Sequence, residues 1–265
     1  MVNIQQYKRK DDFMKQCKIK NLTIGNDIPK ICVPIVASSK EELQKVLPQY
    51  ADCKDIDVIE WRGDYLSEAA NPQYMIELAK EIRSFLPAIP LLFTFRTKKE
   101  GGEQEITFSD YANLNLSLAK SGFVDMVDIE LFATSDSTEL SSLVNQLHQT
   151  EAKIIFSNHD FHKTPDEDTI LSRLTSMEQL GADIAKIAVM PQSAKDVVTL
   201  LSATVKAKES LNIPIVTMSM GKLGAISRIS GGTFGSAMTF GALTKASAPG
   251  QISVDKLKDF LTTLY

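Results

Sequence analysis

Asp183-Ile-Ala-Lys-Ile-Ala-Val-Met-Pro191 has the length and the β-branched content of a strand that is buried on both faces. Gly181-Ala182 precede this run, and Pro191 ends it. Lys186 is the exception within it, because a buried lysine must be paired, reach water, or be kept neutral by desolvation. A neutral lysine amine is a nucleophile that forms Schiff bases with ketones and aldehydes. Taken alone, the run favours the simpler interpretation, a lysine at a strand end that reaches solvent or pairs with a carboxylate.

The same kind of apolar run recurs along the chain from Ile31 on, each time followed by an amphipathic helical stretch. Strand–helix alternation predicts parallel pairing, and eight repeats in about 250 residues is the number in a (β/α)8 barrel. A doubly wound sheet is the alternative, but no GxGxxG motif follows the first run. The sequence therefore predicts an α/β fold, a (β/α)8 TIM barrel. The expected strands are 31–37, 57–61, 89–95, 124–130, 153–157, 184–189, 214–218 and 234–240.

Several helix starts carry capping signals. Ser39 precedes an acidic first turn, and Asn71-Pro72 places a proline at the first position of the next helix. Further starts are expected at Ser109-Asp110, 135–139, 164–167 and 191–193. The seventh helix is expected to be short, around 223–229, and the last one to span Val254–Leu264.

The N-terminal part precedes the repeat. Residues 1–15 are polar and are interpreted as an extension, whereas Cys17–Ile24 alternates apolar and polar residues and is followed by the turn signal Gly25-Asn26-Asp27. We expect 16–30 to form a β-hairpin that closes the bottom of the barrel. Because no linker rich in Pro, Gly or Ser is present, 1–265 is interpreted as one domain.

The composition excludes several classes of protein. Among 265 residues, 29 are Lys or Arg and 33 are Asp or Glu, a net charge of -4 with no basic stripe, which argues against nucleic-acid or anionic-membrane binding. No apolar run approaches the roughly 20 residues of a membrane span, and 1–10 lacks the apolar region of a signal peptide. Three cysteines, Cys17, Cys32 and Cys53, have no metal-ligand spacing and are expected as free thiols in a reducing cytoplasm.

Charged and polar residues gather at the expected strand ends. Active sites of such barrels lie at the C-terminal ends of the strands and in the loops that follow. Charges at one end of apolar strands are costly unless they pair or take part in chemistry. Each could singly form a structural ion pair, but together they predict a site. They are Glu60, Arg62, Arg96, Glu100, His159, Lys186, Arg228, Ser247 and Gln251.

His159 stands at a strand-to-loop junction, and its ordinary pKa suits proton transfer near neutrality. Glu100 could accept a hydrogen bond from the imidazole and fix its tautomer. The alternatives are a loop histidine satisfied by backbone and an exposed carboxylate in Lys98-Lys99-Glu100. The other histidines, His148 and His162, are expected at the surface.

Arg62, Arg96 and Arg228 supply positive charge that suits an anionic substrate, since a guanidinium holds a carboxylate through two hydrogen bonds. Their alternative is pairing with nearby carboxylates, which we also expect in part. Of these carboxylates, two are expected to point inward beneath Lys186 or the arginines as supporting groups. The nearby carboxylates are Glu60, Asp64, Asp128 and Glu130, the last two being the supporting pair.

The glycine-rich stretch 231–236 is similar to a phosphate-binding loop, at a place where barrels often bind phosphate. The signal is weak, because glycines there also serve strand–helix packing. A metal site is not expected, since the carboxylates have arginine neighbours and no histidine pair has ligand spacing.

With these residues assembled, the chain resembles the type I 3-dehydroquinate dehydratase family from Cys17 to Leu264. The resemblance rests on several separate motifs in the family's order. They are Glu60-Trp-Arg62, Phe93-Thr-Phe-Arg96-Thr-Lys-Lys-Glu100-Gly-Gly, Val127-Asp-Ile-Glu130, Asn158-His159-Asp160-Phe161, Gly181–Pro191, Ile226-Ser-Arg228 and Ser247-Ala-Pro-Gly-Gln251.

The resemblance implies a role for each candidate residue. Lys186 falls on the Schiff-base lysine, His159 on the proton-transfer residue and Glu100 on its partner. The family's first strand can carry a substrate-contacting serine, but Pro34 stands near that place here, so this contact stays unassigned. Glu60, Arg62, Arg96, Arg228, Ser247 and Gln251 fall on substrate-contact positions.

The resemblance also implies the reaction, a syn dehydration of 3-dehydroquinate to 3-dehydroshikimate in the third step of the shikimate pathway to chorismate and the aromatic amino acids. It implies no cofactor and a homodimer. The loop Thr244–Ser253, with Ala-Pro-Gly inside it, is long enough to act as a lid that excludes water. Two alternatives stay open. One is a class I Schiff-base aldolase whose 231–236 loop holds a phosphosugar, and the other is a catalytically silent small-molecule-binding barrel.

Overall fold

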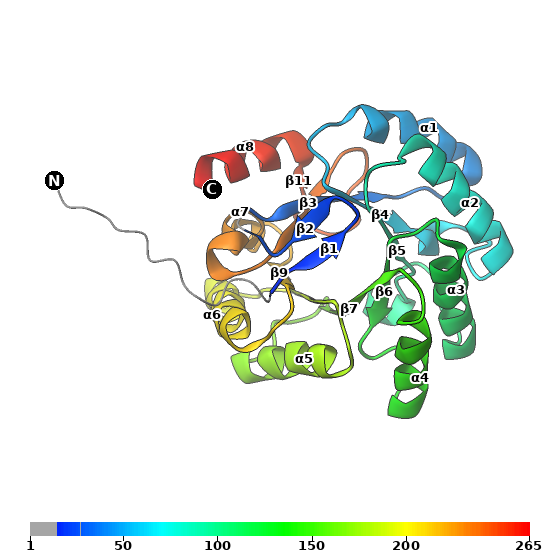
Figure 1. The fold of residues 1–265 in the computed structure, drawn as a ribbon. Helices are drawn as coiled ribbons and strands as arrows, with labels where there is room; N and C mark the ends of the chain where they lie inside the picture. The colour runs from blue at the N-terminus through cyan, green and yellow to red at the C-terminus, as the bar shows by residue number, and fades with distance from the viewer. Residues whose placement is uncertain (1–14, 27) are drawn as a thin grey trace.

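The structure of this chain is a computed structural model, which describes residues 15–26 and 28–265. Within these described residues, nine parallel strands form one curled sheet in the order β11-β10-β3-β4-β5-β6-β7-β8-β9, and eight helices surround them (Figure 1). The strands are β3 (Lys30–Ile35), β4 (Val58–Arg62), β5 (Leu91–Thr94), β6 (Met126–Glu130), β7 (Lys153–Asp160), β8 (Ile184–Val189), β9 (Ile215–Ser219), β10 (Met238–Ala242) and β11 (Ile252–Ser253).

Strand β9, at one end of this order, meets the start of β10 near the other end, and this contact closes strands β3 to β10 into a barrel. Ile215 at the start of β9 forms a parallel bridge with Ser236 just before β10. The amide of Ala237 donates to Ile215 O at 2.7 Å, and the amide of Thr217 donates to Ser236 Oγ at 3.0 Å. The predicted (β/α)8 barrel is therefore confirmed, with β11 as an added short strand.

Most helices begin where the capping signals place them. Ser39 Oγ accepts from the amide of Glu42 at the start of α1, and Asn71 Oδ1 accepts from the first-turn amides of α2. The third helix begins earlier than expected, because Thr107 is its N-cap. The helices are α1 (Lys40–Asp52), α2 (Pro72–Phe85), α3 (Phe108–Ser121), α4 (Ser137–Leu147), α5 (Glu167–Gln179), α6 (Ala194–Ser210), α7 (Ala225–Phe234) and α8 (Val254–Leu264), with short 3-10 turns η1 (Gly63–Tyr65) and η2 (Lys98–Glu100).

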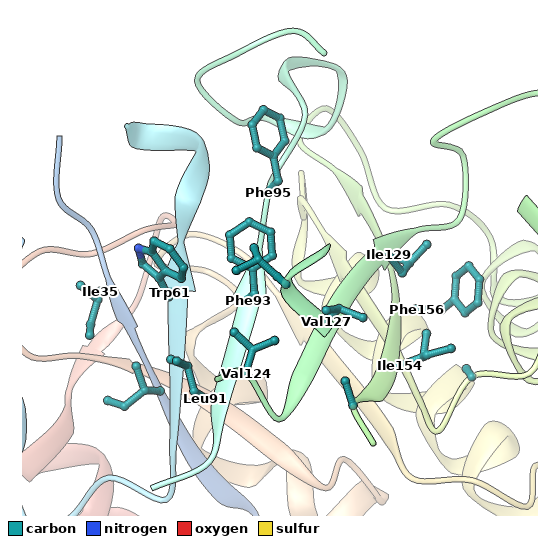
Figure 2. Close-up of a cluster of buried hydrophobic side chains, with 14 of the residues drawn as sticks. Ile35, Trp61, Leu91, Phe93, Phe95, Val124, Val127, Ile129, Ile154 and Phe156 are labelled. Atoms are coloured by element: carbon teal, nitrogen blue, oxygen red, sulfur yellow. The ribbon is translucent and has the colours of Figure 1, made fainter. Parts of the chain in front are cut away.

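Alternate side chains of each strand point outward and inward. The outward set packs beneath the helices in one large apolar cluster that includes Trp61, Phe93, Val127 and Phe156 (Figure 2). Trp61 and Phe93 from neighbouring strands meet edge to face, with ring centroids 5.2 Å apart. The inward set is apolar at the N-terminal ends of the strands and polar toward their C-terminal ends, so the packing itself confines polar groups to one end of the barrel.

The N-terminal hairpin packs against the apolar end. Its strands are β1 (Cys17–Ile19) and β2 (Leu22–Ile24), which pair antiparallel, so the hairpin lies within the expected range 16–30. The hairpin turn lies at Lys20, whose φ is 52°, whereas Gly25-Asn26 form a bend after the hairpin and Asp27 lies outside the described residues. Cys17, Ile19 and Ile24 share a buried cluster with the first inward residues of the strands, which covers the barrel bottom. Figure 1 shows this dark-blue pair inside the ring of helices. The proposed extension, apart from Lys15, lies outside the described residues.

The structure corrects the region before β10. Helix α7 continues through Gly231 and Gly232 to Phe234, beyond the expected end at 229, and the eighth strand begins only at Met238. The glycines were interpreted as a break, but the backbone donors of the last turn stay paired with carbonyls of the preceding turn. The 231–236 segment therefore forms a helix end beside the start of β9, opposite the polar end of the barrel. The expected position of this segment, at the end of the barrel where such folds often bind phosphate, is therefore wrong.

Candidate active site

A cavity opens at the C-terminal end of the barrel, where the polar inward side chains lie. Eight of the nine predicted site residues line it, together with apolar groups from β8, β9 and β10. These eight come from five different strands or the loops after them, which explains why they are dispersed in the sequence. They are Glu60, Arg62, Arg96, Glu100, His159, Lys186, Ser247 and Gln251.

Lys186 lies on β8 with its amine at the base of the cavity. Its side chain is 4% exposed, and Nζ lies 3.4 Å from Asp128 Oδ2 and 3.6 Å from Glu60 Oε1. The ring of Phe240 forms the opposite contact, with its centroid 4.6 Å from Nζ. The amine is thus buried and polarised by two carboxylates, and it still faces the cavity. The lysine is therefore paired with carboxylates and does not reach solvent, and whether its amine also acts as a nucleophile is a matter for the proposed function.

Arg96 is the centre of a buried ion-pair network beside the lysine. Its guanidinium donates to Asp128 Oδ1 and Glu130 Oε1, both at 2.8 Å, and to Ser157 Oγ at 3.1 Å. Burial would raise the pKa of Asp128, but the charges of Arg96 and Lys186 outweigh it and lower that pKa. Asp128 is thereby kept ionised between two cations. The two carboxylates predicted to lie beneath the lysine and the arginines are found there.

Glu100 and His159 form a hydrogen-bonded pair at the cavity wall. Glu100 Oε2 lies 2.9 Å from His159 Nδ1 and also accepts from the His159 backbone amide at 2.9 Å. Burial, followed by the charge of Glu130, raises the pKa of Glu100 to about 7. Burial, together with the charges of Arg96, Lys186 and Arg62, lowers the pKa of His159 well below its usual value. A neutral imidazole that donates from Nδ1 to an ionised Glu100 leaves Nε2 free to accept a proton.

Arg62 is held by Asp64, one of the carboxylates expected as an alternative partner of the arginines. Its Nε and Nη2 donate to the two carboxylate oxygens of Asp64 at 2.8 and 2.7 Å. Asp64 is fully buried and also accepts from the backbone amides of Arg96 and Glu103. This carboxylate thus fixes Arg62 while it ties the loops after β4 and β5 together. Arg62 still lines the cavity, so the expected division between structural pairing and ligand contact fits its position.

Arg228 differs from the other two arginines. It is 1% exposed on α7, and its guanidinium contacts Met218 Sδ at 3.7 Å and Pro249 O at 3.1 Å. Among residues 15–26 and 28–265 it has no carboxylate partner, and its Nε has no hydrogen-bond partner. Burial lowers its pKa to about 10. It lies behind Met218, which lines the cavity, so this is the one predicted residue outside the lining itself.

The loop after β10 covers this side of the cavity. Gln251 and Ser247 bond to each other, and Ser247 O accepts from Arg62 at 3.4 Å. The amide of Gly221 donates to Pro249 O at 3.1 Å, the same carbonyl that Arg228 reaches. The loop is therefore seated against the barrel top through Arg62, Gly221 and Arg228.

In the part of the chain that the structure describes, no group of three or more His, Cys, Asp or Glu side chains is placed to hold a metal ion. Within the same residues, no helix combines the length and apolar character needed to cross a bilayer.

Comparison with known proteins decides the family. The model of the type I 3-dehydroquinase family matches residues 31–265. The chain belongs to the type I 3-dehydroquinase family. Among curated proteins, it is 50% identical over 241 residues to a 3-dehydroquinate dehydratase of Clostridium kluyveri, covering 91% of this chain and 94% of that one. It is 48% identical over 256 residues to that of Listeria monocytogenes, covering 95% and 99%.

Solved structures of 3-dehydroquinate dehydratases share the fold. A type I 3-dehydroquinate dehydratase from Clostridium difficile, crystallised with covalently modified comenic acid, gives a TM-score of 0.90 at 46% identity, covering 94% of this chain and 98% of that one. The enzyme from Enterococcus faecalis gives 0.85 at 43% identity, covering 93% and 98%.

Sequence reasoning did not assign roles to several groups that the structure places in or behind this type I 3-dehydroquinase site. Met218, Met220 and Phe240 form the apolar wall of the cavity, and their inward direction could have been read from strand alternation. Asn158 Nδ2 donates to Glu100 Oε1 at 3.0 Å, and its Oδ1 accepts from Arg173 on α5 at 2.8 Å. The partnership with Arg173 carries no local signal, since 15 residues separate the pair. No residue of β3 lines the cavity within the described part of the chain, in keeping with Pro34 on that strand.

Proposed function

We propose that this type I 3-dehydroquinase dehydrates 3-dehydroquinate to 3-dehydroshikimate, the third step of the shikimate pathway, through a Schiff base on Lys186. The observation that carries the proposal is the placement of the amine, which is 4% exposed and faces the cavity beside two carboxylates. A buried amine at the end of a barrel is arranged to act as a nucleophile, because water is excluded from the imine that it forms.

The first stage of the reaction forms the electron sink. The Lys186 amine attacks the C3 ketone, and the carbonyl oxygen leaves as water to give an iminium. Asp128 and Glu60 lie within 3.6 Å of Nζ, so they can take up the proton of the Lys186 ammonium and pass it to the departing oxygen, which then leaves as water. The two carboxylates also balance the positive charge of the iminium. Asp128 is held in place by Arg96 and Ser157, which keeps it ionised for this purpose.

The second stage moves one proton on the imidazole of His159. The iminium acidifies C2, and Nε2 of His159 removes the C2 proton to give an enamine. The enamine expels the C1 hydroxyl, which leaves as water with the proton from the same imidazole. A further water then hydrolyses the product imine and frees Lys186. Glu100 supports both transfers, because its Oε2 lies 2.9 Å from Nδ1 and holds the ring and its tautomer.

The remaining residues are proposed to bind the substrate. Arg228 is assigned to the C1 carboxylate, because it is a buried cation without a carboxylate partner in the described residues. Gln251 and Ser247 assist from the loop after β10, which we propose acts as a lid over the imine. Glu60, Arg62 and Arg96 are assigned to the ring hydroxyls and to the orientation of the ring.

The wider setting follows from the same resemblance. We propose that 1–265 is one domain that acts as a homodimer in the cytoplasm, and that the reaction needs neither a cofactor nor a metal, since Lys186 supplies the electron sink. Sedimentation of the purified protein tests the dimer, and turnover in the presence of a strong chelator tests the metal-free reaction.

The deciding experiment is borohydride reduction of the protein mixed with 3-dehydroquinate, followed by mass spectrometry of its peptides. We expect one adduct, on the peptide that contains Lys186. Lys195→Ala, which removes an exposed lysine on α6, should label as fully as the wild type. An adduct that forms only with phosphosugars would indicate the aldolase alternative, although the 231–236 segment expected to hold phosphate lies at the other end of the barrel. No adduct from folded protein would overturn the Schiff-base proposal.

A further inference from the structure

The pair Asn158 and Arg173 lies behind Glu100, on the side away from the cavity. Asn158 is 4% exposed on β7, and Arg173 reaches it from α5 on the outside of the barrel. The guanidinium of Arg173 also stacks 5.6 Å from the ring centroid of Phe132, an exposed residue after β6. Neither Asn158 nor Arg173 lines the cavity, so neither has a place in the reaction proposed above.

The contacts fix the orientation of the Asn158 amide. A guanidinium has donors only, so the atom that faces Arg173 Nη1 at 2.8 Å is the amide oxygen. The amide nitrogen must then face Glu100 Oε1, at 3.0 Å. A flipped amide would set its oxygen against the carboxylate and its NH2 against the guanidinium, and both contacts would be repulsive.

The orientation decides which form of Glu100 is favoured. Oε1 of Glu100 accepts a hydrogen bond from the Asn158 amide, and Oε2 accepts one from the backbone N–H of His159. Neither of these N–H groups can become an acceptor, so both contacts favour the ionised carboxylate. A protonated Glu100 would have to present its own hydrogen to one of these donors, or to His159 Nδ1. In the last case the imidazole hydrogen would move to Nε2, and the ring would no longer be a base.

We infer that Asn158, held by Arg173, is a positioning residue for the Glu100–His159 pair and sets the lower pH limit of the dehydration. The inference rests on the proposed function, in which His159 moves the proton. Arg173, which stacks on Phe132 outside the barrel, thereby influences the proton transfer inside it through Asn158.

The other charged groups around Glu100 oppose one another. Burial and Glu130 on β6 raise the pKa of Glu100, whereas Arg96, Asn158 and the His159 backbone amide lower it, with a result of about 7. Arg96 Nη1 lies 3.8 Å from Oε2. Among the described residues, the neighbouring charged groups on η2 and β7 neither pair nor hydrogen-bond with this carboxylate; they are Lys98, Lys99 and Asp160. With the pKa near neutrality, the loss of one hydrogen bond changes the ionised fraction where the enzyme works.

The test is the pH dependence of kcat/KM with 3-dehydroquinate, measured from pH 5 to 9 for the wild type, Asn158→Leu, Arg173→Ala and Arg173→Lys. A hydrogen bond to a carboxylate corresponds to about one pKa unit or more, so Asn158→Leu should move the acid limb up by about one unit. At pH 7 the ionised fraction of Glu100 then falls from about half to about one tenth, and kcat/KM falls about fivefold. The loss should be in kcat, with KM within about twofold of the wild type, and should recover at pH 9.

The other variants separate positioning from general damage. Arg173→Ala should give a smaller shift in the same direction, since the Asn158 amide is then free to flip, and Arg173→Lys should restore the limb because an ammonium also only donates. The matched control is Lys206→Ala on α6. It removes a surface ion pair to Glu167, which lies on α5 like Arg173, and it should leave the acid limb of the pH profile in place. If Asn158→Leu does not fold, Arg173→Ala against Arg173→Lys still decides.

Two negative results differ in meaning. A wild type that leaves 3-dehydroquinate unchanged overturns the proposed function and the inference with it. An active wild type whose Asn158→Leu and Arg173→Ala variants keep the acid limb, even if they unfold more easily, overturns the inference alone.

Discussion

Asp128 Oδ2 lies 3.4 Å from Lys186 Nζ, and both side chains are buried inside the barrel. Asp128 also receives hydrogen bonds from Arg96 at 2.8 Å and Ser157 at 2.6 Å, so it cannot turn away from the lysine. The same carboxylate thus joins the catalytic amine to the ion-pair network of Arg96. A change at Asp128 should therefore affect both the folded state and the chemistry.

We expect Asp128→Asn to lower the free energy of unfolding by about 3–5 kcal/mol, because it leaves Arg96 and Lys186 buried without this counter-charge. Urea unfolding at pH 7 measures the change. The pKa of Asp128 is lowered in the folded state, so its contribution to stability is complete above the unfolded pKa near 3.9 and is lost as the pH falls through the folded value. The difference between wild type and variant should therefore be constant near neutrality and shrink only in acid. An unchanged unfolding midpoint would contradict this account.

We expect Lys186→Ala to abolish turnover and borohydride labelling while the fold stays intact, because no other described lysine lines the cavity. Asp128 keeps its bonds from Arg96 and Ser157 in this variant, so the far-ultraviolet circular dichroism should match the wild type. Lys195→Ala serves as the control. Turnover that survives in Lys186→Ala would exclude the covalent route.

We expect His159→Ala to separate imine formation from proton transfer. The amine of Lys186 and its two carboxylates are untouched, so borohydride should still trap an adduct on Lys186. The multiple turnover rate should fall by about 10²–10⁴-fold, the usual contribution of a positioned acid–base group. His162→Ala, at an exposed loop position, is the matched control. A His159→Ala rate near that of the wild type would remove the imidazole from the mechanism.

The sequence predicts the barrel well because its periodicity is set by packing. Each strand is buried on both faces, so apolar runs such as 184–189 stand out, and their C-terminal ends bring distant residues such as Glu60 and Lys186 together. What the sequence misses depends on geometry without local periodicity. Gly231 and Gly232 were interpreted as a loop although tertiary packing keeps them helical, and the hairpin turn at Lys20 was not expected because this lysine adopts a positive φ usually left to glycine.

The link from Arg173 to Asn158 shows the same limit within the site. Asn158 lies in the motif that carries His159, but nothing in that motif tells which side chain on the outer helices orients its amide. Such partners become visible only when α5 is packed on β7. The sequence therefore predicts the residues around the cavity better than those that hold them.

We expect Arg228→Met to lose substrate affinity while gaining or keeping stability. Arg228 is a buried cation without a carboxylate partner among the described residues, and a methionine of similar length removes its desolvation cost. The loss of a charged hydrogen-bonded clamp should raise KM by roughly 10–100-fold, since such contacts contribute about 1.5–3 kcal/mol. Thermal unfolding should show no decrease in the melting temperature. A variant that loses stability and keeps KM would show that Arg228 holds the loop at Pro249 and not the substrate.

Glu100 should make the protein less stable as the pH rises toward neutrality. Its pKa is about 7 in the folded state and 4.5 by reference, so between these values the folded protein binds more protons than the unfolded chain. Stability then falls with rising pH, by up to about 3 kcal/mol across this window. The free energy of unfolding in urea, measured from pH 4.5 to 8, gives the slope.

The matched variants isolate this carboxyl from all other titrating groups. Glu100→Gln cannot ionise, so the difference in unfolding free energy between it and the wild type should shift in favour of the variant between pH 5 and pH 7. Glu105→Gln, an exposed carboxyl on the same loop, should run parallel to the wild type. The gain in stability of Glu100→Gln should come with lost turnover. If the single amide oxygen of the glutamine faces His159, its NH2 must face the NH2 of Asn158, and these two donors repel each other. Parallel curves for all three proteins would mean that Glu100 is ionised throughout, and that the burial of this carboxyl does not oppose its function.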